Sequence, residues 1–442
     1  MGKSFMRNVV LSKKLIFDIL FVLLCVSLLY RLYVHLFSAL GYDSWSVSEY
    51  LINYQGGFVR RGIVGEILFF FANNFDFDIE WTIKVICLFF FIFVSSFFIK
   101  SFLKKGYSLY LLPLCFFLGG MISSSHWYLA FWIRKDFLMM AFFIVILWIW
   151  NCNRKNSPLF LKVVLINLLS IFTILTHEVV VFFSLPILFL LFLHLYKNKK
   201  TSIAIILSFL SLSPSILAFF TVFFMHGDQQ TAQAIWDSWS FLLLGVVSDI
   251  PPKAIDAIGW TNEHAINRHL MENFLKVEKD ILSSVYWCIV FPVVYYISTN
   301  ALLVFRKKEE DFTVDHKTKL SSILLFQFIC LFPVLCILSC DWVRIIFYWI
   351  ASSFAIFLIV PMTTLEKLFP EKFIKLVEAI NKRLSNLLTP TKTHIAFFML
   401  FIGISCVSFD FLYIYESSAV YQILYIISKP FVFAINHILS PL

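Results

Sequence analysis

The chain has 442 residues, of which 60% are hydrophobic and only 14% are charged. A soluble domain carries roughly a quarter charged residues, and repeated apolar runs of about twenty residues predict a polytopic, all-α membrane protein. The runs are continuous rather than alternating, which argues against a strand-built barrel. The net charge of +9 does not indicate nucleic-acid binding, because most basic residues lie in short clusters between the runs.

The apolar runs predict about eleven membrane-spanning helices in one integral membrane domain, residues 1–442. The first run follows basic residues and no small-x-small cleavage site follows it, so we interpret it as a retained span. The last apolar stretch, 419–439, is interrupted by Lys429 and Pro430, and is either a kinked twelfth span or two interfacial pieces. The expected spans are 15–40, 81–99, 107–125, 137–151, 158–176, 179–196, 202–225, 281–305, 320–340, 343–363 and 394–413.

Basic residues are concentrated in alternate connections, which predicts that these connections and the N-terminus face the cytoplasm. The longest inner connection, about 363–393, has an amphipathic pattern and is expected to lie on the membrane surface. Two longer connections are expected outside. The first, about 41–80, is long enough for interfacial helices, and the other covers about 226–280.

Residues predicted outside form a short list of mixed acids and bases near span ends. Ionisable residues at such depth are costly and tend to mark a site. Arg60 and Arg61 oppose the usual charge bias, and guanidinium groups match phosphate in fork geometry. Gly56, Gly57 and Gly62 beside them permit a close backbone approach. The candidate residues are Asp43, Glu49, Arg60, Arg61, Arg134, Lys135, Asp136, His177, Glu178, Asp341 and Arg344.

Several of these motifs have a structural alternative. His177-Glu178 is either part of a site or a polar turn between two spans. Asp341-x-x-Arg344 places both side chains on one helical face. There Arg344 either grips phosphate while Asp341 orients it, or the pair caps a span.

Two further patterns are weaker. Asp76-Phe-Asp78 resembles a metal-binding DxD pair but fits a solvated turn better. The 226–280 loop combines acids with Trp236, Trp239 and Trp260, a composition that suits sugar binding.

The segment 53–62 (NYQGGFVRRG), with Arg134-Lys135-Asp136, His177-Glu178 and Asp341-Trp342-x-Arg344, resembles bacterial O-antigen and capsular polysaccharide polymerases. The plan is also similar to that of GT-C-type glycosyltransferases, which have many spans and an acid and interfacial helices in the first outer loop. The resemblance implies a multi-pass protein of the bacterial inner membrane whose site faces the periplasm.

The resemblance also implies roles. Asp43 is the candidate catalytic acid of the first loop, with Glu49 as the alternative, because an adjacent acidic pair is missing. His177 and Glu178 complete the catalytic set. The diphosphate-binding residues are Arg60, Arg61, Arg134, Lys135 and Arg344, and the orienting residues are Asp136 and Asp341.

The implied reaction is polymerisation of lipid-diphosphate-linked oligosaccharide repeat units. It needs no cofactor if arginines neutralise the diphosphate, although a divalent cation stays an alternative. The implied partners are the polyprenyl-diphosphate substrate, membrane lipid and, as an open alternative, a chain-length regulator protein. Two other functions remain: a GT-C transferase that adds single sugars from a lipid-monophosphate donor, and a lipid-linked oligosaccharide flippase. A transporter should place charge near mid-membrane and often has repeats, whereas these charges lie at span ends.

Overall fold

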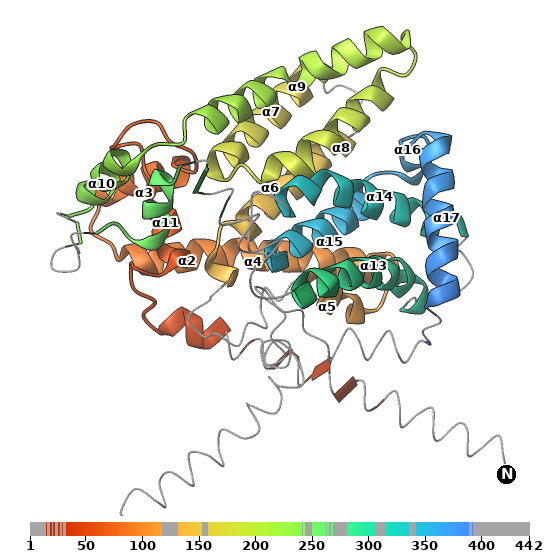
Figure 1. The fold of residues 1–442 in the computed structure, drawn as a ribbon, viewed down its shortest axis with the longest axis horizontal. Coiled ribbons are helices and arrows are strands. Elements are labelled where there is room, and N and C mark those ends of the chain that lie inside the picture. The colour runs from red at the N-terminus through yellow and green to blue at the C-terminus, as the bar shows by residue number, and fades with distance from the viewer. Residues whose placement is uncertain are drawn as a thin grey trace, which may run out of the picture.

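The computed structural model describes residues 15, 18–19, 21–22, 25–26, 29, 32–116, 131–152, 158–240, 242–243, 250–261, 263–264, 267, 281–305, 314–335, 342–388 and 391. Within these ranges, all regular structure is helical (Figure 1). The long helices are α3 (Ile63–Asn74), α4 (Ile79–Lys104), α6 (Asp136–Asn151), α7 (Leu159–Thr176), α8 (Val180–Leu195), α9 (Thr201–Phe224), α10 (Gln229–Ser238), α13 (Ile281–Val304), α14 (Val314–Pro333), α15 (Trp342–Ile359) and α17 (Glu371–Leu387). The short elements are α2 (Trp45–Ser48), η1 (Glu49–Leu51), η2 (Leu109–Leu111), α5 (Leu112–Phe116), η3 (Phe131–Ile133), α11 (Lys253–Asp256), η4 (Ala257–Gly259) and α16 (Met362–Leu365).

Three helices in the described ranges, α4, α7 and α9, are long and apolar enough to cross a membrane. Their apolar residues are not all buried: Phe89 of α4 is 62% exposed and Leu217 of α9 is 66% exposed. A helix that is apolar on every side suits a lipid environment, so these faces support a helical membrane protein. Helices also occupy the predicted spans around 137–151, 179–196, 281–305, 320–340 and 343–363. The total number of spans stays a prediction, and the stretches 394–413 and 419–439 lie outside the described residues.

Helix α15 forms the centre of the bundle. Its side chains from Arg344 to Ile359 are buried, and it packs against α6, α8 and α14. Small residues Ser352 and Ser353 permit close helix packing, and each hydroxyl donates to the carbonyl of Trp349. The hydroxyls of these two serines are therefore satisfied within the helix that carries Arg344.

A polar junction joins α7 to α9 beside Pro214. Proline lacks an N–H and disturbs the helical hydrogen bonds around it. The Asn167 amide donates to the carbonyl oxygen of Ser211 (2.7 Å) and accepts from the backbone N–H (3.3 Å) and hydroxyl (2.7 Å) of Ser215. One side chain thus satisfies backbone groups on both sides of the proline.

The two ends of the bundle differ (Figure 1). At one end lie α2, α3, α10 and α11, contributed by the connections 41–80 and 226–280; we call this the loop end. At the opposite end, α17 runs across the ends of α13 and α14, as expected for the amphipathic connection at 363–393. Val377 on its inner face is fully buried. Candidate site residues and the amphipathic helix thus lie at opposite ends.

Candidate functional site

Nine of the eleven predicted site residues form one cluster of ionisable side chains at the loop end, hereafter the charge cluster. They come from five places in the chain: η1, the turn before α3, the start of α6, the turn between α7 and α8, and the start of α15. The members are Glu49, Arg60, Arg61, Arg134, Lys135, Asp136, His177, Glu178 and Arg344.

Arg61 and Glu178 form the best-aligned pair of the cluster. Arg61 Nε donates to Glu178 Oε2 (3.0 Å) and an η nitrogen donates to Oε1 (2.5 Å), which is the bidentate geometry of strong guanidinium–carboxylate pairs. Each side chain is 20% exposed. Burial alone would raise the pKa of Glu178, but Arg61 and the other cations hold it well below the usual value. Glu178 is therefore an ionised partner of Arg61.

The backbone of Arg61 is in the left-handed region, with φ of 66°. A residue with a Cβ pays for this conformation, and such residues cluster at functional sites. The side chain of Lys135 stabilises this conformation, because its Nζ donates a hydrogen bond to the Arg61 carbonyl oxygen (2.9 Å). Lys135 is completely buried and lies 5.5 Å from the Tyr50 ring centroid. Lys135 therefore positions Arg61 from inside the protein.

Burial also changes the protonation of Lys135 and His177. Loss of hydration lowers the pKa of Lys135 to about 8, although Glu49 nearby opposes the shift. Burial likewise lowers the pKa of His177 well below its usual value. The Nδ1 atom of His177 lies 3.3 Å from the Val179 backbone nitrogen and 3.5 Å from Glu178 Oε2, and its Nε2 lies 3.8 Å from Glu49 Oε1. His177 thus acts as a neutral neighbour of Glu49.

Glu49 is completely buried at the centre of the cluster. Its Oε2 accepts from Arg134 Nε (3.2 Å), and the guanidinium carbon of Arg134 lies 6.0 Å from the Trp45 ring centroid. Burial would raise the pKa of Glu49, but Arg134 and Arg344 outweigh it and hold the pKa well below the usual range. This carboxylate is an ionised structural anchor for Arg134.

Arg344 pairs with an acid far from it in sequence. Its Nε lies 2.9 and 3.0 Å from the two carboxylate oxygens of Asp136, and the Tyr348 hydroxyl also donates to Asp136. Asp136 is completely buried. Asp341, the acid predicted to lie beside Arg344, is outside the described residues, so that pairing stays a prediction. Among the described residues, the acid that orients Arg344 is Asp136.

Arg60 makes long contacts with the described part of the cluster. Its closest carboxylate atom, Glu178 Oε1, is 3.9 Å away, and one η nitrogen donates weakly to the Ala257 carbonyl oxygen (3.4 Å). Its Nε is buried without a hydrogen-bond partner among the described residues. The side chain is 26% exposed, so Arg60 lies where the cluster meets the outside.

Among its described members, the cluster carries more positive than negative charge. Four arginines and Lys135 face three carboxylates, which leaves two excess positive charges within this set when Lys135 is protonated. This potential would attract an anionic ligand.

Asp43 lies apart from these pairs. It is exposed in the turn before α2, and no side-chain hydrogen bond or ion pair of Asp43 is found within the described residues. Asp78 caps α4 by accepting the Trp81 N–H (2.8 Å), and Asp76 beside it is exposed. The described residues contain no group of three or more His, Cys, Asp or Glu side chains arranged to hold a metal. Asp78 of the DxD pair thus caps a helix.

Two of the three glycines near the arginines contact protein. A Cβ on Gly62 would lie 2.3 Å from the Tyr54 ring, and a Cβ on Gly56 would lie 2.6 Å from the Thr231 carbonyl oxygen on α10. Gly57 has φ of 118° and open space around the position of a Cβ. Glu66 of α3 accepts from the Tyr54 N–H (2.8 Å) and the Gln55 amide (2.9 Å). Protein atoms thus occupy the close approach at Gly56 and Gly62, which fixes the turn that presents Arg60 and Arg61.

Residues of the loop 226–280 pack against the segment that carries Glu49. Trp236 and Trp239 are almost completely buried, and Trp239 Nε1 donates to the Leu51 carbonyl oxygen (2.8 Å). Asn53 donates to the Ser238 hydroxyl (2.8 Å). These two tryptophans are core residues that hold η1 in place, and only the partly exposed Trp260 retains a surface for stacking.

No protein-family model, curated protein or solved structure matches this chain. The function is therefore inferred from the geometry of the charge cluster.

Proposed function

We propose that this protein is a membrane glycosyltransferase that polymerises lipid-diphosphate-linked oligosaccharide repeat units at the outer face of a bacterial inner membrane. The observation that carries the proposal is Arg60 at the edge of the charge cluster, because its side chain is partly exposed and its Nε has no hydrogen-bond partner among the described residues. A diphosphate offers multiple anionic oxygens to guanidinium groups. Its position at one end of a helical bundle suits a ligand anchored in a bilayer.

The arginines divide into two roles. Arg61, Arg134 and Arg344 each have a carboxylate partner at 3.2 Å or less, so these three shape the site and set its potential. Arg60 has the unsatisfied Nε and the weaker contacts. Arg60 is accordingly the residue that contacts the diphosphate, and Lys135 keeps Arg61 beside it.

In the proposed reaction, a sugar hydroxyl oxygen attacks the anomeric carbon of the lipid-linked donor. The new C–O bond forms as the anomeric C–O bond to phosphate breaks, and the hydroxyl proton passes to a carboxylate. General bases contribute roughly 10²–10⁴-fold. Asp43 is the proposed base because it is exposed, whereas Glu49 is completely buried against Arg134. The departing polyprenyl diphosphate gains negative charge, which Arg60 and the cationic excess stabilise.

The test replaces the gene for this protein in its native host with a gene for a variant. The length distribution of the surface glycan is then measured. Arg60→Ala and Asp43→Asn should reduce long polysaccharide to single repeat units on the outer lipid carrier. Lys253→Ala and Asp76→Asn are matched controls, since both residues are exposed at the same end. Membrane expression is checked by blot. Normal chain lengths in Arg60→Ala would overturn the proposal.

The same experiment separates the other functions. Loss of a flippase would leave repeat units trapped on the cytoplasmic side. Loss of a single-sugar transferase that uses a lipid monophosphate would leave repeat units lacking one sugar, without a change in their polymerisation. Both outcomes contradict the polymerase proposal.

A further inference from the structure

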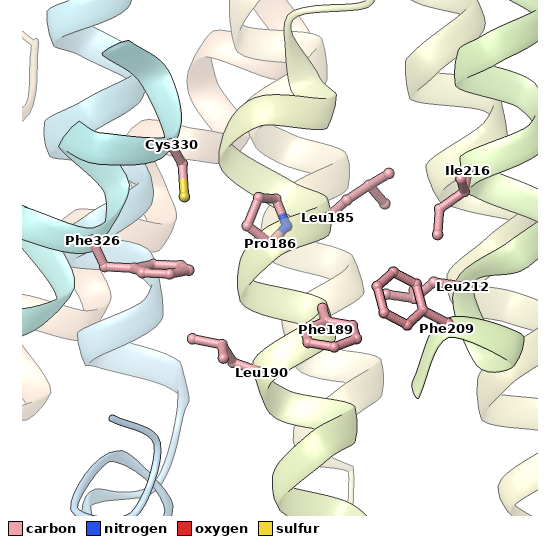
Figure 2. A pocket seen from close by; sticks show the side chains of 9 residues that line it. All are labelled: Leu185, Pro186, Phe189, Leu190, Phe209, Leu212, Ile216, Phe326 and Cys330. Carbon is pink, nitrogen blue, oxygen red and sulfur yellow. The ribbon is translucent and has the colours of Figure 1, made fainter. Parts of the chain in front are cut away.

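An apolar, open-sided cavity of about 360 Å³ lies along α8, with α9 on one side and α14 on the other (Figure 2). This size falls in the range of about 300–1,000 Å³ that is usual for small-molecule sites. It contains no charged lining residue, and the least apolar group is the Cys330 thiol. Its walls include Leu185 and Phe189 of α8, Leu212 and Ile216 of α9, and Phe326 and Cys330 of α14.

Helix α8 connects this cavity to the charge cluster. Glu178 lies in the turn that precedes α8, and the cavity residues Leu185 and Phe189 follow it by seven and eleven positions. At 1.5 Å per residue, they lie roughly 10 and 16 Å along the helix from Glu178. Pro186 also lines the cavity, and α8 separates α9 on one side from α14 on the other (Figure 2). An elongated molecule can therefore have one end in the cluster and its middle in the cavity.

Resting on the function proposed above, we propose that this cavity binds the hydrocarbon chain of a polyprenyl phosphate whose headgroup lies at Arg60. The chemistry of the two sites indicates which ligand fits. A site with excess positive charge lies at one end of α8, and an apolar cavity lies further along the same helix. A long apolar chain with an anionic head matches both. The cavity would then select donors by the chain next to the phosphate.

The first experiment measures binding to the full-length protein in detergent by native mass spectrometry. The probes are undecaprenyl phosphate and inorganic pyrophosphate, which has the anionic head without a chain. Ile216→Trp fills the cavity. Leu217→Trp is the matched control, because Leu217 neighbours it on α9 and is 66% exposed.

The proposal predicts that Ile216→Trp weakens undecaprenyl phosphate binding at least tenfold, while Leu217→Trp binds like the wild type. Pyrophosphate binding should be the same in all three proteins. Equal undecaprenyl phosphate binding in the two tryptophan variants would overturn the cavity assignment and leave the headgroup site intact. If wild type binds neither probe, the proposed function fails along with the cavity.

A second measurement needs no variant and so does not depend on folding of Ile216→Trp. A polyprenyl phosphate with a diazirine in the chain near the phosphate is photo-crosslinked to wild-type protein, and the labelled peptides are identified. Labels on α8, α9 and α14, displaced by undecaprenyl phosphate, support the assignment. Labels confined to other helices overturn it, as does equal displacement by phosphatidylglycerol, since an ordinary phospholipid would then fill the cavity.

Discussion

Replacing Glu178 with glutamine separates the structural role of this carboxylate from a catalytic one. The change keeps the shape of the side chain but removes the charge that pairs with Arg61 at 2.5 and 3.0 Å. Removing one partner of a buried ion pair costs about 3–5 kcal/mol. Both side chains are 20% exposed, and glutamine still offers one acceptor oxygen, so we expect a loss of about 2 kcal/mol of folding stability.

The affinity for an anion should rise in Glu178→Gln, whereas the folding stability falls. Glu178 Oε1 is 3.9 Å from an η nitrogen of Arg60, so a phosphate on Arg60 would lie within about 8 Å of the carboxylate. One unit charge at that distance, with an effective dielectric constant of about 20, amounts to ~2 kcal/mol. This energy corresponds to about thirty-fold in affinity as an upper bound. Glu178→Gln should therefore bind pyrophosphate three- to thirty-fold more tightly while unfolding at a lower temperature.

The assay combines thermal unfolding in detergent with pyrophosphate titration at fixed ionic strength, because salt screens such interactions. Arg61→Ala is the reference variant and should lose both stability and affinity. Weaker pyrophosphate binding in Glu178→Gln, at unchanged stability, would refute the reasoning, because Glu178 would then contact the ligand instead of restraining Arg61.

Three further predictions concern the scaffold. The pKa of Lys135 is about 8 in the folded state, below its ordinary value of 10.5, so the unfolded chain binds more protons between these values and stability should rise from pH 8 to 10.5. The rise, measured by thermal unfolding, should be smaller in Lys135→Met, and an equal rise in both proteins would contradict burial of the ammonium. Gly65→Ala should abolish stable membrane expression, because its Cβ would lie 1.9 Å from the Ile52 carbonyl oxygen; normal expression on a blot would refute this packing. Asn167→Leu should lower the unfolding temperature, because it leaves backbone groups beside Pro214 without a hydrogen-bond partner. Each such group costs about 1–3 kcal/mol. An unchanged unfolding temperature would argue against the polar junction between α7 and α9.

The sequence predicts the helical membrane class and the residues that cluster, for identifiable physical reasons. Apolar runs reveal helices because hydrocarbon allows few other backbone solutions. Charges such as His177 and Glu178 stand out because ionisable groups at span ends are costly. These signals are local, so they can be read one segment at a time.

The pairings of those residues are not local, and the sequence does not predict them. Arg344 pairs with Asp136, which lies 208 positions away, and its expected interaction with Asp341 stays a prediction because Asp341 lies outside the described residues. Lys135 is buried and donates to the Arg61 carbonyl oxygen, a contact that the sequence does not reveal. The supporting roles of Tyr348 and Glu66 went unrecognised, because a tyrosine in an apolar run and a glutamate in the first turn of a helix are ordinary features.

The long separation between Asp136 and Arg344 has a consequence for biogenesis. A ribosome adding about 5–20 residues per second produces Arg344 about 10–40 s after Asp136, given the separation of 208 positions. During this interval the Asp136 carboxylate, which is completely buried in the finished protein, lacks the guanidinium that neutralises it. The ion pair between α6 and α15 can therefore form only late in synthesis, and the packing of α15 against α6 that it accompanies is late as well.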